Sequence, residues 1–127
     1  MIPLDEYKAQ AGEAREKLRE AGVSINPPAL REELDALEAR MGEPDFWNDV
    51  EAANRVNQRV KALQGKLARY EKLVAQGEDL ETLMEMAEEE DDESLAEEIR
   101  AETAAFVQSV DALELELLLK GPYDGSN

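Results

Sequence analysis

The chain contains no cysteine and no histidine among its 127 residues. Disulfides, thiolate metal centres and the commonest general bases are therefore excluded. Its serines stand in caps, on a helix surface or near the end of the chain, without an activating base at a recognisable spacing, and no glycine-rich phosphate loop is present. We expect no enzyme, and no catalytic residue, metal ligand, cofactor or small-molecule site.

Aromatic residues make up only 5 % of the sequence, and apolar residues never form a run long enough to cross a membrane, which takes about 18 residues. The first residues also lack the apolar core of a signal peptide. We therefore expect a cytoplasmic protein without a membrane partner.

Basic residues are scarce in one half of the chain. Residues 1–76 hold 14 acidic and 12 basic residues, whereas residues 77–127 hold 17 acidic residues and only 2 basic ones, within a net charge of −17. The second half should repel phosphate, while the nearly neutral first half can present a local basic face.

Apolar residues recur at helical spacing, at alternating intervals of three and four residues. One such stripe predicts a helix from about 49 to 76, ended by Gly77. Its members are Ala53, Val56, Val60, Leu63, Leu67, Tyr70 and Val74. A second stripe predicts a helix from about 94 to 120. Its members are Ala96, Ile99, Thr103, Phe106, Val110, Leu113 and Leu117. Two helices of matched length should pair antiparallel, so we expect these two to form the main hairpin.

Three shorter helices are predicted around this hairpin. The first spans about 3–20 and is followed by Gly22, the second begins after the N-cap Asn26 with Pro27 at its first position and stops at Gly42, and the third covers about 80–88. The acidic run at 88–93 should form the turn before the last helix. The expected fold is all-α, with an antiparallel helical hairpin or coiled coil inside a small four- to five-helix bundle. Residues 1–120 should form one domain and 121–127 the start of a linker.

The segment Glu43-Pro44-Asp45-Phe46-Trp47-Asn48-Asp49 is the most unusual in the chain. Phe46 and Trp47 are expected to close one end of the bundle as a hydrophobic plug, with a ligand-binding role as the alternative. Asn48 with Glu51 three residues later predicts a capping box at the start of the long helix. We expect Phe46, Trp47 and Asn48 to form a structural corner.

Basic residues of the long helix fall into two groups. Arg59 and Lys66 flank its apolar stripe and should pair with Glu102 and Glu116 of the last helix. Four others face outward: Arg55, Lys61, Arg69 and Lys72. They form either a solvated face or a contact strip for RNA phosphate or an acidic protein.

The order and spacing of three segments carry a resemblance to a known family. These segments are the Pro-Asp-Phe-Trp-Asn corner, the acidic segment 83–92 and the exit segment from Leu-Glu-Leu-Glu to Gly-Pro-Tyr-Asp at 113–124. Over residues 4–127 the chain resembles the N-terminal domain of bacterial peptide chain release factor 2. The resemblance implies a helical arm that docks at the stalk base of the large ribosomal subunit, beside the uL11-type protein and its rRNA. It also implies contact with the GTPase class-II release factor.

The resemblance implies a role in translation termination at UGA and UAA codons. The family reads these codons with a Ser-Pro-Phe tripeptide and promotes peptidyl-tRNA hydrolysis with a Gly-Gly-Gln loop, and neither sequence occurs in these 127 residues. This stretch is therefore expected to be the docking arm alone. Without the resemblance, the charge distribution would fit a free-standing acidic coiled-coil adaptor that binds a basic protein through residues 77–98.

Overall fold

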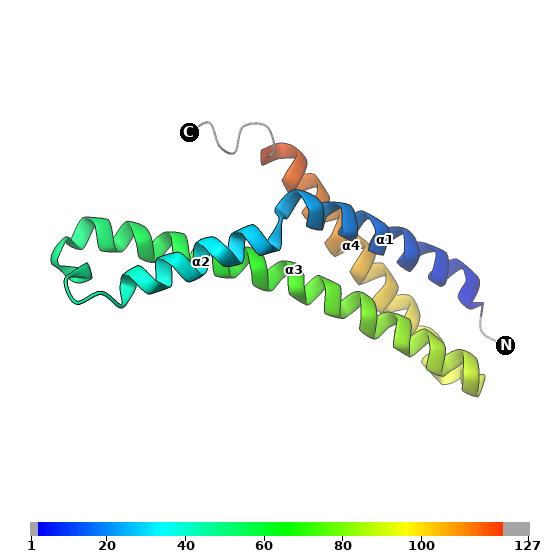
Figure 1. Cartoon of the computed structure of the whole chain (residues 1–127). Coiled ribbons are helices and arrows are strands. Elements are labelled where there is room, and N and C mark those ends of the chain that lie inside the picture. The colour runs from blue at the N-terminus through cyan, green and yellow to red at the C-terminus, as the bar shows by residue number, and fades with distance from the viewer. Residues whose placement is uncertain (1–2, 121–127) are drawn as a thin grey trace. The chain divides into compact units, whose positions relative to one another are not determined.

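A computed structural model describes residues 3–120, and its regular elements are all helical (Figure 1). It contains α1 (Leu4–Ile25), α2 (Pro27–Met41), η1 (Phe46–Asn48), α3 (Val50–Glu90), η2 (Glu93–Leu95) and α4 (Ala96–Lys120), where η marks a single 3₁₀ turn. No strand occurs between residues 3 and 120. The all-α prediction is confirmed. The predicted linker at 121–127 lies outside the described residues.

The helices pack as two compact units. Unit 1 comprises Met1–Val23 and Lys72–Asn127, and unit 2 comprises Ser24–Glu71. Helix α3 contributes its first part to unit 2 and its second part to unit 1.

Unit 1 contains α1, the second part of α3, and α4. The second part of α3 and α4 are joined by the short corner at 91–95 and run antiparallel (Figure 1). Helix α1 contacts both, because Lys8 pairs with Glu88 of α3 and the Nζ of Lys17 lies 3.3 Å from Oδ1 of Asp111 on α4. The side chains buried most completely in this unit are those of Ala87, Ile99, Thr103, Phe106 and Val110.

Helix α3 is one continuous helix of 41 residues, so the predicted end at Gly77 and the separate helix at 80–88 are wrong. Gly77 is buried, and a Cβ added to it would lie 2.9 Å from Cζ of Phe106 and 3.3 Å from Cγ of Arg15. The glycine therefore admits the Phe106 ring against the helix backbone. Glycine inside a helix costs only about 1 kcal/mol relative to alanine, so close packing can outweigh its tendency to end the helix.

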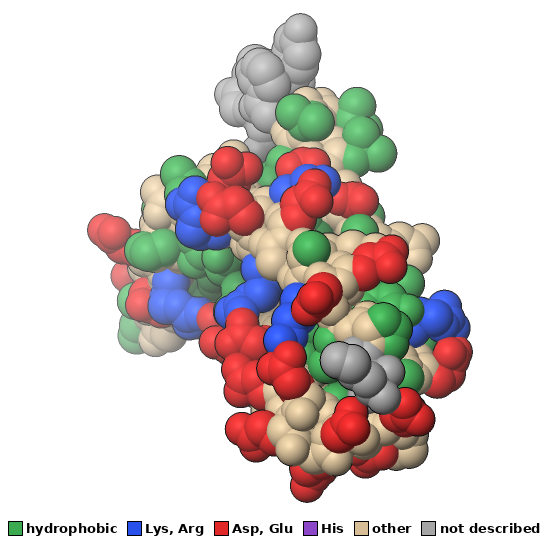
Figure 2. Space-filling view, turned by 90° about the vertical axis from the view of Figure 1, so that its right-hand side faces the viewer, with side chains coloured by type: hydrophobic (Ala, Val, Ile, Leu, Met, Phe, Trp, Pro, Cys, Tyr) green, Lys and Arg blue, Asp and Glu red, His purple; other side chains and the backbone are tan. Residues whose placement is uncertain are grey.

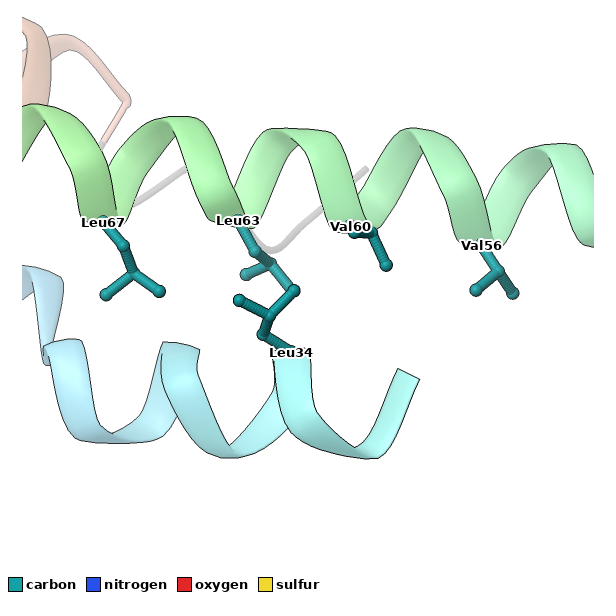
Figure 3. Packing of buried hydrophobic residues seen from close by; sticks show 5 residues of the cluster. All are labelled: Leu34, Val56, Val60, Leu63 and Leu67. Atoms are coloured by element: carbon teal, nitrogen blue, oxygen red, sulfur yellow. The ribbon is translucent and has the colours of Figure 1, made fainter. Parts of the chain in front are cut away.

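Unit 2 is a hairpin of α2 and the first part of α3. Leu34 of α2 points toward Leu63 between the two helices (Figure 3). The buried cluster consists of Leu34, Val56, Val60, Leu63 and Leu67, and Leu30, Leu37, Met41 and Phe46 pack against it. The apolar stripe of α3 between Val56 and Leu67 is thus covered by α2. The predicted pairing of this stripe with the last helix is wrong, since α4 belongs to the other unit.

The helix ends follow the capping rules unevenly. Asn26 is the N-cap of α2 as predicted, with φ 56° and ψ 69°, and its side chain accepts a hydrogen bond of 3.4 Å from the Ala29 amide. Helix α2 also stops at Gly42 as expected. Helix α1 instead continues past Gly22, which is buried, to Ile25. The predicted end of the first helix near residue 20 is therefore wrong, because the burial of a glycine inside a helix is not visible in the sequence.

Two glycines inside α3 should respond to alanine in opposite ways. A Cβ at Gly65 would meet nothing within 4 Å, so Gly65→Ala should raise the free energy of unfolding by about 0.5–1 kcal/mol through helix propensity alone. At Gly77 the added methyl would displace the Phe106 ring, and overpacking of about 1–3 kcal/mol should exceed that gain. Urea unfolding of both variants checks this, and a stabilised Gly77→Ala protein would contradict the close packing.

Candidate interaction surfaces

Four exposed basic residues of α3 were singled out in the sequence. Arg55, Lys61 and Arg69 lie on the part of α3 in unit 2, and Lys72 lies on the part in unit 1. Within residues 3–120, Arg55 and Lys61 have no carboxylate oxygen within ion-pair distance. Their charges are therefore available to a partner. The structure groups three of the four on unit 2 and leaves Lys72 outside that unit.

A stretch without acidic residues surrounds these three side chains. Between Ala52 and Tyr70 the sequence has five basic residues and no Asp or Glu, although 31 of its 127 residues are acidic. We define the basic face as the exposed residues Arg55, Gln58, Lys61, Ala62, Gly65 and Arg69. Small and amide side chains between the cations allow a phosphate backbone to approach the helix closely. Counting charges in short windows, rather than by halves of the chain, would have found this face.

Arg59 forms an ion pair within unit 2, with Glu33 of α2. Its Nε and Nη2 donate hydrogen bonds of 2.7 and 2.8 Å to the two carboxylate oxygens of Glu33 on α2. The hydrogen bond from Arg59 lowers the pKa of Glu33, and the charges of Arg59 and Lys66 lower it further. Lys66 therefore also acts on Glu33. A second ion pair, Arg31 with Glu71 at 2.7 Å, links the same helices.

The two predicted acidic partners have other surroundings. Glu116 pairs with Lys120, whose Nζ lies 3.3 Å from its Oε1, within α4. Burial raises the pKa of Glu102, and the nearby Glu98 and Asp79 raise it further.

At the corner after α2, Phe46 and Trp47 lie in different environments. Phe46 is half-buried and packs against the unit 2 cluster, whereas Trp47 is 54 % exposed. Their rings meet edge to face, with centroids 4.9 Å apart and planes at 89°. Phe46 covers the end of the unit 2 core, as expected of the predicted hydrophobic plug. Trp47 does not fit that prediction, because a large part of its side chain is exposed.

Asp49, and not Asn48, caps α3. The Asp49 side chain accepts a 3.1 Å hydrogen bond from the Ala52 amide, and its backbone is extended at φ −101° and ψ 96°. The Asn48 amide instead donates to the Asp45 carbonyl, 3.1 Å away, in the turn of η1. The predicted capping box of Asn48 and Glu51 was one residue too early because the turn of η1 uses the Asn48 backbone.

In unit 1 the corner between α3 and α4 lies within the acidic run, but the predicted turn at 88–93 began too early, because α3 continues to Glu90. Asp91 has a positive φ of 47°, and Asp92 accepts a hydrogen bond of 2.9 Å from the Ser94 amide. Hydrogen bonds from the Ser94 hydroxyl and amide lower the pKa of Asp92. Carboxylate side chains gather over the lower part of Figure 2. Among the described residues no group of Asp and Glu is arranged to hold a metal ion, and no helix is long and apolar enough to span a membrane.

Helices α1 and α3 of unit 1 also border an open groove of about 750 Å³. Its floor is formed by small or flexible residues, including Ala11, Gly77 and Met84. Lys8 and Arg15 pair with Glu88 and Glu81 across the groove. Its lining also includes Glu16, Arg19 and Glu85.

Comparison with known proteins matches the PCRF domain over residues 30–127. The chain is 33 % identical over 127 residues to peptide chain release factor 2 of Clostridium perfringens, covering 100 % of this chain and 35 % of that protein. It is 41 % identical over 108 residues to the factor of the same name from Acidothermus cellulolyticus, covering 84 % and 29 % of the two chains. For the Nocardia farcinica factor the identity is 43 % over 98 residues, covering 75 % and 26 %.

The chain thus spans about a third of the length of the curated relatives it matches. The match to the PCRF domain includes α2, α3 and α4, and the Clostridium perfringens alignment also takes in α1. The resemblance noted in the corner and exit segments is confirmed. The chain belongs to the peptide chain release factor 2 family, and its helices are an N-terminal domain of that type.

Proposed function

We propose that this chain is the ribosome-docking arm of a release factor that terminates translation at UGA and UAA codons in the cytoplasm. The proposal rests on membership of the release factor 2 family, whose name states the activity of the relatives. In this role it binds the stalk base of the large ribosomal subunit, including the uL11-type protein and its rRNA, and is contacted by the GTPase class-II release factor. Family membership favours this function over the free-standing adaptor.

The basic face of unit 2 is the observation that carries the docking part of the proposal. An acidic chain of net charge −17 would be repelled by rRNA unless it presented a local basic surface. The part of α3 from Ala52 to Tyr70, which has five basic residues and no Asp or Glu of its own, supports such a surface. Affinity for a nucleic acid falls as salt rises, and each phosphate neutralised by a cation makes the slope of log K against log[salt] more negative by about 0.7 to 0.9. Contact through Arg55, Lys61 and Arg69 therefore predicts a slope of roughly −2 to −3. In unit 1, Lys72 is proposed as one further contact.

A charge-reversal pair tests the basic face. The double variant Arg55→Glu/Lys61→Glu should raise the Kd for large ribosomal subunits at least about tenfold near 0.1 M salt, because two phosphate contacts become repulsions. The measurement is co-sedimentation of the chain with large subunits and with subunits stripped of the stalk base.

The matched control is Arg100→Glu/Lys120→Glu, which changes the net charge equally but lies on α4 of unit 1. It should leave the Kd within about threefold, the range of a general charge effect. Equal weakening by both double variants would assign the effect to net charge and contradict the basic face. Failure of the unchanged chain to bind large subunits would contradict the proposed function itself.

A further inference from the structure

We infer that the tip of unit 2, residues 43–51, is a docking site for a basic protein, with Trp47 as its apolar anchor. The inference deepens the proposed function, on which it rests, by assigning a second partner class to a second surface. It is carried by the exposure of Trp47, by the rigidity of the turn that holds it, and by the charge around it.

Exposure is the first observation. Trp47 is the chain's single tryptophan and is 54 % exposed, and Val50, three residues later in the sequence, is 63 % exposed. Packing within unit 2 does not require Trp47 to be this large, because Phe46 is the aromatic residue that contacts the buried cluster. Tryptophan is among the residues most enriched at the energetic centres of protein interfaces. The exposed indole is therefore a suitable anchor.

The turn holds this anchor in place. Backbone amides of Phe46 and Asn48 donate hydrogen bonds of 3.1 Å to the carbonyls of Glu43 and Asp45, and the Asp49 cap fixes the start of α3. The edge of one aromatic ring rests on the other. Because the tip is already ordered, binding would lose little conformational entropy.

The charge around Trp47 selects the kind of partner. Four exposed carboxylates surround it in sequence, from Glu43, Asp45, Asp49 and Glu51, and no Lys or Arg occurs between Met41 and Asn54. Within residues 3–120 none of the four has a basic group within ion-pair distance. They would repel RNA phosphate and attract lysine and arginine side chains. The partner is therefore a protein with an apolar pocket bordered by basic residues.

Unit 2 thus carries two surfaces of opposite sign, the basic face on the stem of the hairpin and the acidic aromatic tip. A partner made only of RNA would satisfy the first surface and be repelled by the second. A partner made only of basic protein would do the reverse. A ribonucleoprotein surface satisfies both, and the tip should meet its protein component.

The single tryptophan makes the test specific. The chain is labelled with 5-fluorotryptophan, so that one ¹⁹F resonance reports on Trp47, and is titrated with intact large ribosomal subunits and with protein-free rRNA from the same subunits. The resonance should change its chemical shift with intact subunits, whereas free rRNA, bound through the basic face, should broaden it without moving it. A change of chemical shift with free rRNA would overturn the assignment to a protein. A change with the concentration of the chain alone would assign the tip to self-association and also overturn it.

Affinity provides the second measurement. Trp47→Ala should raise the Kd for large subunits about 30-fold or more, as expected when a central interface tryptophan is removed. The matched control is Leu118→Ala, which truncates a side chain that is 71 % exposed on α4 and should leave the Kd unchanged. Circular dichroism shows whether both variants keep their helix content. If the unchanged chain binds and Trp47→Ala binds equally well, the tip inference is wrong while the proposed function stands. If the unchanged chain does not bind, both fail.

Discussion

Replacing Phe106 with alanine should lower the free energy of unfolding of unit 1 by about 3–5 kcal/mol. The Phe106 side chain is 0 % exposed and its ring fills the space left by Gly77 on α3. Truncation would leave a cavity between α3 and α4 that the glycine cannot fill. For a domain of this size such a loss is a large fraction of the total stability. Thermal and urea unfolding followed by circular dichroism give the value.

Leu118→Ala on the same helix is the control for this prediction. The Leu118 side chain is 71 % exposed, so its truncation should change the free energy of unfolding by no more than about 0.5 kcal/mol. A Phe106→Ala protein as stable as the Leu118→Ala protein would show that the ring does not fill the core of unit 1. The double variant Gly77→Ala/Phe106→Ala adds a further check. The methyl should restore part of the lost stability, because it enters space that the ring has left.

The sequence predicted well which residues are buried. The spacing of three and four residues selected Val56, Val60, Leu63 and Leu67 on α3, all of which are 9 % exposed or less. It also selected the five buried positions of α4 from Ile99 to Leu113. Burial of one stripe follows directly from helical periodicity, because the stripe needs only some apolar cover. The agreement weakens near Tyr70 and Val74, where Leu73 is buried instead and α3 passes from unit 2 to unit 1.

The partner of each stripe could not be predicted in the same way. Heptad spacing is shared by several helices of this chain, and nothing in it distinguishes α2 from α4 as the cover for Leu63. Matched length favours the last helix, whereas α2 contributes only Leu34 as a buried residue, with Leu30 and Leu37 partly buried. Gly77 was misread for a related reason. A glycine packed against a ring has the same sequence signal as a glycine that ends a helix.

The candidate surfaces depend on properties that periodicity does not report. Arg55, Lys61 and Arg69 were found as outward-facing cations, but their grouping on unit 2 apart from Lys72 required the packing. The exposure of Trp47 could also be recognised only from the structure, because two adjacent aromatic residues at a corner would ordinarily both be buried. Its acidic neighbours were visible in the sequence and are the signal that could have indicated an exposed position.

Leu63→Ala should lower the free energy of unfolding of unit 2 by about 2–5 kcal/mol, because the Leu63 side chain is 0 % exposed at the centre of the cluster. Leu34→Ala should cost less, since its side chain is already 8 % exposed. The informative comparison is between the stability loss of the double variant and the sum of the two single losses. Leu34 and Leu63 face each other between α2 and α3 (Figure 3), so the double variant should be less destabilised than the sum by about 0.5 kcal/mol or more.

The same cycle performed with Leu63 and Phe106 distinguishes the observed packing from the hairpin expected from matched helix lengths. In that hairpin the stripes of α3 and α4 would face each other, and the two truncations would be coupled. In the structure Leu63 belongs to the cluster of unit 2 and Phe106 to the core of unit 1, so their effects should add within about 0.3–0.5 kcal/mol. Coupling between Leu63 and Phe106 together with additivity between Leu63 and Leu34 would reverse the assignment of α2 as the cover of this stripe. The basic face would then lie on a different hairpin from the one described.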